Sequence, residues 1–282
     1  MMDTVVSPRW LLARLYEPEL VIADCRFLLS EPEAGRSAYL KDHIPGAVYL
    51  HLEEQLSAPV GKHGGRHPLP EPHEIAAVLG QAGISRDSIV VAYDDQGGAY
   101  ASRLWWMLRY VGHEKVYVMD EGYSAWKTAN FPVSDSQPVR IPTLYEPEVH
   151  PEMLAGIDEV RTISQEGGAS SPLLIDSREP RRYEGLEEPI DSKAGHIPGA
   201  INRFWKDVLD DQGRWKDAEA LKQHFADVDP GREVIVYCGS GVSACPNVLA
   251  LKRAGFDKVR LYPGSWSDWI SYEENAVATG IE

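Results

Sequence analysis

The amino-acid sequence predicts an α/β protein made of two tandem copies of one domain, each a parallel sheet with helices on both faces. One observation is an internal repeat, because four segments of the first half return in the same order in the second. They pair residues 20–26 with 173–178, 42–48 with 195–201, 89–94 with 233–238, and 116–126 with 259–269. The other observation is that short β-rich runs alternate with longer helical patterns in each half. The chain is therefore interpreted as two homologous halves.

The expected elements follow these patterns along the chain. Residues 20–26 and 173–178 each predict an apolar strand that ends in Asp-x-Arg, and residues 89–94 and 233–238 predict a further strand in each half. Residues 101–111 and 242–254 have the apolar spacing of helices. Residues 132–151 contain five prolines and little periodicity, which is typical of a linker. We place the division there, with domains at 1–140 and 141–282.

Length and charge exclude several classes of protein. A chain of 282 residues suits two domains that each bury a core. Its net charge of −15 disfavours a nucleic-acid partner, since binding phosphates requires a basic face. No apolar run approaches the length of a membrane span, and the three cysteines fit a reducing compartment. We therefore expect a cytoplasmic protein with no membrane partner.

The segment that indicates chemistry is the turn between the strand at 234–237 and the helix that follows it. Cys238 lies on this turn, and Gly239 and Gly241 can adopt dihedral angles that let successive backbone N–H groups point inward. Such a loop binds anions, and the helix N-terminus behind it adds partial positive charge. We expect Cys238 to be held as a thiolate and to act as the catalytic nucleophile.

Two alternative interpretations of Cys238 and its loop have less support from the sequence. A small buried cysteine at a strand end is the structural alternative, but alternating glycines rarely follow such a residue. A cysteine phosphatase requires an arginine six residues after the nucleophile, and that position holds Ala244. Phosphoryl chemistry is disfavoured accordingly.

The Cys-Gly-Ser-Gly-Val-Ser-Ala run at 238–244 resembles the active-site loop of the two-domain rhodanese-like sulfurtransferases, in the form found in 3-mercaptopyruvate sulfurtransferases. The form that uses thiosulfate carries basic residues where this chain has Gly239 and Ser240. The resemblance extends over nearly the whole chain and implies two rhodanese-like domains. It also implies that a first, idle copy covers the working site in the second.

The reaction that the resemblance implies is a double displacement. Cys238 takes sulfur from a small anionic donor, 3-mercaptopyruvate before thiosulfate, and a persulfide then passes it to cyanide, a thiol or a thioredoxin-like protein. No metal or other cofactor is needed. The alternative is a persulfide carrier or rhodanese-like binding module that delivers sulfur to a protein partner without turning over free donors.

The expected substrate-binding residues are the rest of the loop and two arginines. The loop residues are Gly239, Ser240, Gly241, Val242, Ser243 and Ala244. Arg182 matches an arginine that contacts substrate in the resembling enzymes. Arg178 is a second candidate, although its repeat partner Arg26 favours an ion pair that fastens a strand end. The resembling enzymes have another arginine shortly before the His-Ile-Pro-Gly motif, and here Lys193 is the basic residue in that stretch.

Several histidines invite a role. His43 matches a residue proposed to relay protons in the mercaptopyruvate enzymes, so we take His43 and Ser240 as a candidate relay, with a purely structural His43 as the alternative. The aspartate of that relay has no clear match here. His63, His67 and His73 lie in a glycine-rich loop, where their spacing is weak support for a metal site. Residues 66–70 resemble a segment of the idle domain, and we expect this loop to pack at the domain junction.

The repeat also marks residues that we expect to be inert. Asp94 takes the place of the nucleophile in the first half, and Asp95 beside it repels anions, so only the second half should be active. Cys25 and Cys245 are expected to be packed thiols without a catalytic role.

Overall fold

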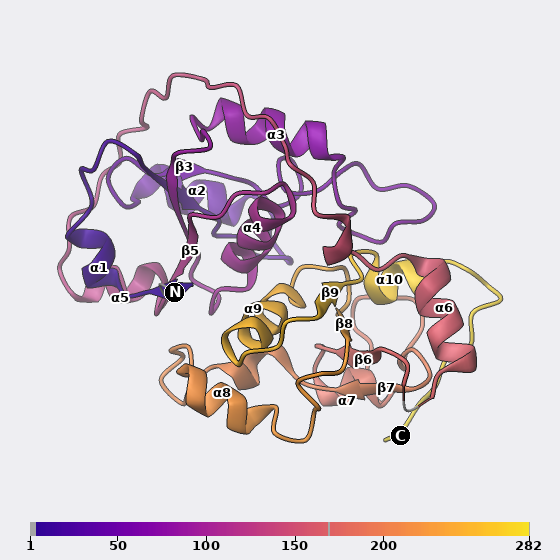
Figure 1. Cartoon of the computed structure of the whole chain (residues 1–282). Coiled ribbons are helices and arrows are strands. Elements are labelled where there is room, and N and C mark those ends of the chain that lie inside the picture. Colours follow the sequence, from indigo (N-terminus) through magenta and orange to yellow (C-terminus); the bar gives the residue numbers. More distant parts are fainter. Residues whose placement is uncertain (1–3, 169, 282) are drawn as a thin grey trace. The chain divides into compact units, whose positions relative to one another are not determined.

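The computed structural model of the chain describes residues 4–168 and 170–281, which form two units, each compact in itself (Figure 1). Unit 1 comprises Met1–Ala58, Pro70–His150 and Asp211–Trp215, and unit 2 comprises Pro59–Leu69, Pro151–Asp210 and Lys216–Glu282. The main change of unit therefore falls at the end of the proline-rich linker at 132–151. A short segment of each half, at 59–69 and at 211–215, packs into the unit formed by the other half.

Unit 1 is built on a five-stranded sheet in which every pair of neighbouring strands is parallel. In the order β1-β5-β4-β2-β3, its strands are Val5–Val6 (β1), Val116–Met119 (β5), Ile89–Tyr93 (β4), Leu20–Asp24 (β2) and Val48–Tyr49 (β3). Its helices are Pro8–Leu12 (α1), Ala34–Lys41 (α2), Pro72–Gln81 (α3), Ala99–Tyr110 (α4) and Gly122–Thr128 (α5). The predicted helix at 101–111 is thus confirmed as α4.

Unit 2 has a four-stranded parallel sheet in the order β7-β6-β8-β9. Its strands are Leu173–Asp176 (β6), Ala200–Asn202 (β7), Val234–Tyr237 (β8) and Val259–Leu261 (β9). Its α-helices are Ile157–Glu166 (α6), Pro180–Tyr183 (α7), Ala218–His224 (α8), Cys245–Arg253 (α9) and Ser265–Trp269 (α10), with 3₁₀ turns at Pro151–Met153 and Trp205–Val208. Figure 1 shows α8 and α9 on one side of these strands and α6 and α10 on the other.

The two sheets confirm the repeat that the sequence predicts. Reading β6, β7, β8 and β9 as copies of β2, β3, β4 and β5, both sheets have one strand order, and unit 1 adds β1 at an edge. Repeat partners also occupy matching places in the cores, because Trp126 and Trp269 are both buried in them. The residue that directly follows the central strand is Asp94 in unit 1 and Cys238 in unit 2. The fold therefore presents two versions of one loop.

In the part of the chain that the structure describes, no helix has the length and apolar character required to cross a membrane.

Candidate active site

The start of the Cys238 loop, residues 238–244, is fixed by the N-terminus of α10. The Cys238 N–H donates to Ser265 Oγ (3.1 Å), and its carbonyl accepts the Trp266 N–H (2.9 Å). The Gly239 carbonyl accepts the Ser267 N–H (2.9 Å). The Cys238 side chain is 1% exposed. Cys238 is thus held in one place, since its backbone is bonded on both sides.

The loop then turns sharply at Gly241. This residue has φ +75°, and a Cβ added to it would lie 2.2 Å from the Pro263 carbonyl oxygen, so no other residue fits. Helix α9 begins only at Cys245, three residues later than the predicted start at 242. The intervening residues are therefore free to curl as a loop, as expected for an anion-binding turn.

The backbone N–H groups of this loop are available to a ligand. Within residues 4–168 and 170–281, no acceptor is bonded to the N–H groups of Gly239, Ser240, Val242, Ser243 and Ala244. Buried or half-buried N–H groups are nearly always paired in proteins, so a run of unpaired ones marks a place for a bound anion.

In the equivalent loop of unit 1, backbone N–H groups bind a carboxylate. The Asp94 carboxylate accepts four backbone N–H groups at 2.8–2.9 Å, from Gln96, Gly98, Tyr100 and Ala101. Burial raises the pKa of Asp94, and these four hydrogen bonds oppose the rise. By the repeat, Ser240, Val242 and Ala244 correspond to the first three donors. One copy of the loop is thus filled by its own carboxylate, whereas the other is open.

Residues 59–69, here called the 59–69 loop, pack against α10 of unit 2. The Gly64 N–H donates to Asp268 Oδ1 (2.7 Å), and the Arg66 N–H donates to Ser267 Oγ (3.0 Å). At Gly65, φ is +82° and an added Cβ would lie 2.4 Å from the Gly264 carbonyl oxygen. The first half of the chain therefore supplies a segment to the unit that holds Cys238.

This segment brings His67 to the Cys238 loop. Its Nδ1 lies 2.7 Å from Ser240 Oγ, and the side chain is buried. His43, which the sequence analysis paired with Ser240, lies in unit 1, where its Nδ1 is 2.7 Å from the Tyr39 carbonyl and its Nε2 is 3.2 Å from the Ser136 carbonyl. In unit 2 the histidine beside Ser240 is thus His67, which was not predicted as a site residue. These contacts favour the structural interpretation of His43.

Two guanidinium groups lie beside Gly239. A Cβ added to Gly239 would lie 2.7 Å from Arg66 Nη2 and 3.7 Å from Arg182 Nη2. Arg182 is one of the predicted substrate-binding residues, whereas Arg66 was not predicted as one. Lys193, offered as the second cation, has an exposed side chain. The resemblance of residues 66–70 to a family segment was the signal that could have identified Arg66 and His67.

Arg178 has the ion-pair contacts that its repeat suggested. Its guanidinium is 1% exposed, binds Asp176 (2.6 Å) and donates to the Gly195 carbonyl (2.6 Å), as Arg26 binds Asp24 and the Asp42 carbonyl in unit 1. Burial lowers the pKa of Arg178, but the charge and hydrogen bonds of Asp176 together with the charges of Tyr237 and Glu188 outweigh this and raise it. This placement favours the structural interpretation of Arg178.

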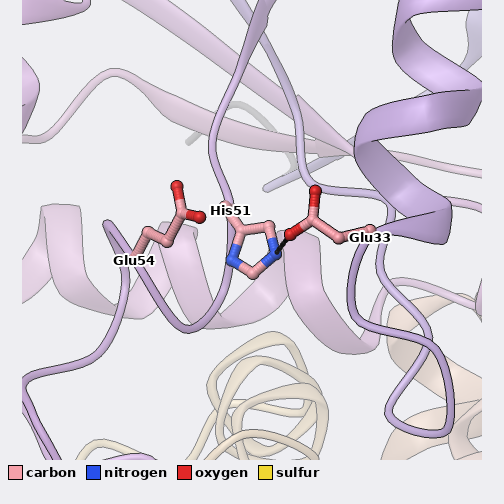
Figure 2. Close-up of side chains that lie close together, drawn as sticks. All are labelled: Glu33, His51 and Glu54. Atoms are coloured by element: carbon pink, nitrogen blue, oxygen red, sulfur yellow. Dashed lines mark ion pairs between the residues drawn. The ribbon is translucent and has the colours of Figure 1, made fainter.

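One cluster has the residue types of a metal site. Among the described residues, the group close enough to share an ion is Glu33, His51 and Glu54, drawn in Figure 2. However, Arg36 already binds both carboxylates, at 3.1 and 2.5 Å. His51 Nδ1 accepts the Glu53 N–H, so the neutral ring carries its proton on Nε2, the nitrogen that faces Glu33. These residues fit an ion pair better than a metal.

The family comparison agrees with the repeat. A family model described as Rhodanese-like domain matches residues 7–129 and 157–272. The two matches cover most of the chain, and each falls on one copy of the repeat.

Similar proteins match the chain over nearly its full length. A Pseudomonas aeruginosa protein named "Probable 3-mercaptopyruvate sulfurtransferase" is 43% identical over 281 residues, covering 98% of both chains. The thiosulfate sulfurtransferase of Gallus gallus is 31% identical over 278 residues, covering 94% of this chain and 93% of that one. The crystal structure of SseA from Escherichia coli, described under the catalytic mechanism of 3-mercaptopyruvate sulfotransferases, superimposes on this chain with a TM-score of 0.79. The two are 30% identical in sequence, and the match covers 94% of this chain and all of that one.

Proposed function

Because the chain belongs to the rhodanese-like sulfurtransferase family, we propose that it moves sulfur through a persulfide on Cys238. The observation that carries this proposal is the pair of repeated loops. In unit 1 the loop N–H groups bind a carboxylate, and in unit 2 the corresponding groups are unpaired around a cysteine. A negatively charged terminal sulfur on Cys238 is the group that suits them.

In the first half-reaction the Cys238 sulfur attacks the sulfur atom of the donor. With 3-mercaptopyruvate, an S–S bond forms and the C–S bond breaks, so the electron pair of that bond remains on carbon as the enolate of pyruvate. With thiosulfate, the S–S bond of the donor breaks and sulfite leaves with the electron pair. The loop N–H groups stabilise the charge on the persulfide that remains.

Ser240 and His67 are positioned for the proton transfers of this step. The donor thiol gives up its proton as its sulfur is transferred, leaving the anionic persulfide, and the pyruvate enolate gains a proton on carbon. The hydroxyl of Ser240, a residue of the Cys238 loop, lies 2.7 Å from His67 Nδ1. An imidazole can both accept and return a proton near neutral pH. We assign proton transfer to this pair, in place of His43 and Ser240.

The donor that fits best is 3-mercaptopyruvate, with thiosulfate second. Gly239 and Ser240 carry no charge, and the cationic groups near them belong to Arg66 and Arg182. The Nη1 group of each arginine donates to no other group in the described part of the chain, so both can bind a donor carboxylate. A donor with one carboxylate and a keto oxygen suits this arrangement.

In the second half-reaction a thiophilic acceptor attacks the outer sulfur and releases the Cys238 thiolate. Cyanide, a small thiol and a thioredoxin-like protein are the proposed acceptors. All three cysteines of the chain are free thiols, and the cytoplasm is the compartment that we propose on that account.

The test is intact-mass spectrometry after treatment with 3-mercaptopyruvate alone. The wild-type protein is expected to gain one sulfur atom and lose it on addition of cyanide, whereas Cys238→Ser gains none. Cys25→Ser and Cys245→Ser are matched controls, because both thiols are also buried, and both should keep the added sulfur. If the mass increase survives in Cys238→Ser, the nucleophile is another residue. Steady-state turnover of free donor with cyanide separates an enzyme from a persulfide carrier.

A further inference from the structure

We propose that Asp191 sets the charge selectivity of this site, so that donors with one negative charge are preferred to donors with two. Asp191 acts through Arg66 and Arg182 and is a specificity-determining residue without itself touching the reacting atoms. The proposal rests on the function proposed above, because it concerns the same donor site.

Asp191 bridges the two guanidinium groups beside the nucleophile. Arg66 Nε lies 2.8 Å from Asp191 Oδ1, and Arg66 Nη2 lies 3.3 Å from Oδ2. Arg182 Nη2 lies 3.1 Å from the same Oδ2. The Asp191 side chain is 3% exposed, so this carboxylate is bound to the two cations and is screened little by water.

All three side chains lie at the residue next to Cys238. A Cβ added to Gly239 would meet Arg66 Nη2 at 2.7 Å and Asp191 Oδ2 at 3.7 Å. A long basic side chain at position 239, as in the thiosulfate-using form, would therefore have to displace the Arg66 guanidinium. The Arg66 guanidinium occupies that space, and it is paired with the Asp191 carboxylate.

The local charges cancel. Arg182 also binds Glu188, at 2.7 Å, and Arg178 binds Asp176 and Glu188. Burial raises the pKa of Glu188, but hydrogen bonds from Arg182 and backbone N–H groups lower it below its usual value, so Glu188 is ionised at neutral pH. Three cations, Arg66 included, thus face three carboxylates, Asp191 included.

A neutral group of this kind selects by charge. Hydrogen bonds from the loop and from the arginine Nη1 groups can hold an anion of either charge, but a dianion gains little more from the arginines than a monoanion does once Asp191 has offset their charge. Removing the Asp191 charge adds one positive charge next to Gly239. Because Coulomb energy is proportional to the ligand charge, the gain in affinity for a dianion should be the square of the gain for a monoanion.

The experiment measures binding in the Cys238→Ser background, where no sulfur is transferred. Isothermal titration calorimetry with pyruvate, a monoanion, and thiosulfate, a dianion, compares Asp191 with Asp191→Asn. We expect affinity to rise about fivefold for pyruvate and about twenty-fivefold for thiosulfate. Asp191→Glu keeps the charge and should restore the original ratio. Asp158→Asn, which removes an exposed carboxylate from Arg161, should change either affinity less than about twofold.

Equal changes for the two ligands, or a loss of affinity for both, would overturn the proposal and leave Asp191 as a structural residue. A second measurement does not require the Asp191→Asn variant to fold. The affinity of Cys238→Ser for thiosulfate should not change between low and moderate salt concentration, because the site has no net charge. A steep fall with salt would contradict the proposal. Neither result tests whether a persulfide forms on Cys238. The intact-mass measurement tests that separately. With Cys238 present, Asp191→Asn should raise kcat/KM for thiosulfate relative to 3-mercaptopyruvate through KM, with kcat unchanged.

Discussion

His67 and Ser240 are 173 positions apart in the chain, yet His67 Nδ1 lies 2.7 Å from Ser240 Oγ. The contact exists because the 59–69 loop leaves the first half of the chain and packs against α10 of unit 2. A histidine and a hydroxyl at this distance can share a proton, whereas His43 has both ring nitrogens at backbone carbonyls.

We predict that His67→Phe lowers kcat with 3-mercaptopyruvate about a hundredfold, because proton transfer loses its base. The acid limb of the kcat profile against pH should disappear, and KM should change little. Ser240→Ala should act similarly, and the double variant should be no worse than either single one, since the two residues act together.

His63→Phe is the control, because His63 lies in the same loop and makes an equivalent contact, Nδ1 to Ser271 Oγ at 2.7 Å. It should change kcat less than about threefold. Equal losses in the two variants would show that the histidines only anchor the loop.

Arg66→Ala and Arg182→Ala should each raise KM for both donors by about ten- to a hundredfold, since each removes one charge-assisted hydrogen bond. The exposed neighbour Arg181, which pairs with Glu187, supplies the control Arg181→Ala, with an effect below about twofold. Side-by-side kinetics of wild-type protein should give 3-mercaptopyruvate the higher kcat/KM. A higher value for thiosulfate would contradict our assignment of the donor.

Asp94→Cys in a Cys238→Ser background is expected to remain inactive, with no sulfur added on intact-mass spectrometry. The exchange opens the first loop by removing the carboxylate that fills it, but Asp95 remains, held by Ser124 at 2.8 and 2.6 Å. Its charge stands where a donor anion would bind. Adding Asp95→Gly to this double variant tests this explanation. Substantial turnover in the double variant of Asp94→Cys and Cys238→Ser alone would show that the first loop is competent.

Cys25 should resist iodoacetamide in the folded protein at pH 9. Burial, together with the charges of Asp24 and Asp94, raises its pKa well above the usual value. Since the thiolate is the reactive form, a raised pKa leaves Cys25 protonated and unreactive at a pH where a free thiol is partly ionised. Peptide mass spectrometry should find Cys25 labelled after unfolding in urea and unlabelled before it. Labelling at equal rates would mean that the thiol is accessible.

Much of the fold and the position of the proposed nucleophile followed from local pattern. Residues close together in the sequence predicted the repeat, the alternating strands and helices, and the strand that ends at Tyr237. They could do so because side-chain periodicity reflects which face of an element is buried. The glycines after Cys238 likewise report a loop conformation that few other residues can adopt. Ion pairs such as Asp24 with Arg26 could be inferred because they recur at the same spacing in both halves.

The remainder of the site required the folded chain. Arg66 and His67 reach the Cys238 loop from a segment that belongs to the first half in sequence and to unit 2 in space, and no spacing rule links positions so far apart. The role that we propose for Asp191 could also be inferred only from the folded structure, since its charge acts through Arg66 and Arg182, which it bridges. Coulomb energy and hydrogen bonding depend on distance between atoms, and only packing sets that distance for residues remote in the chain.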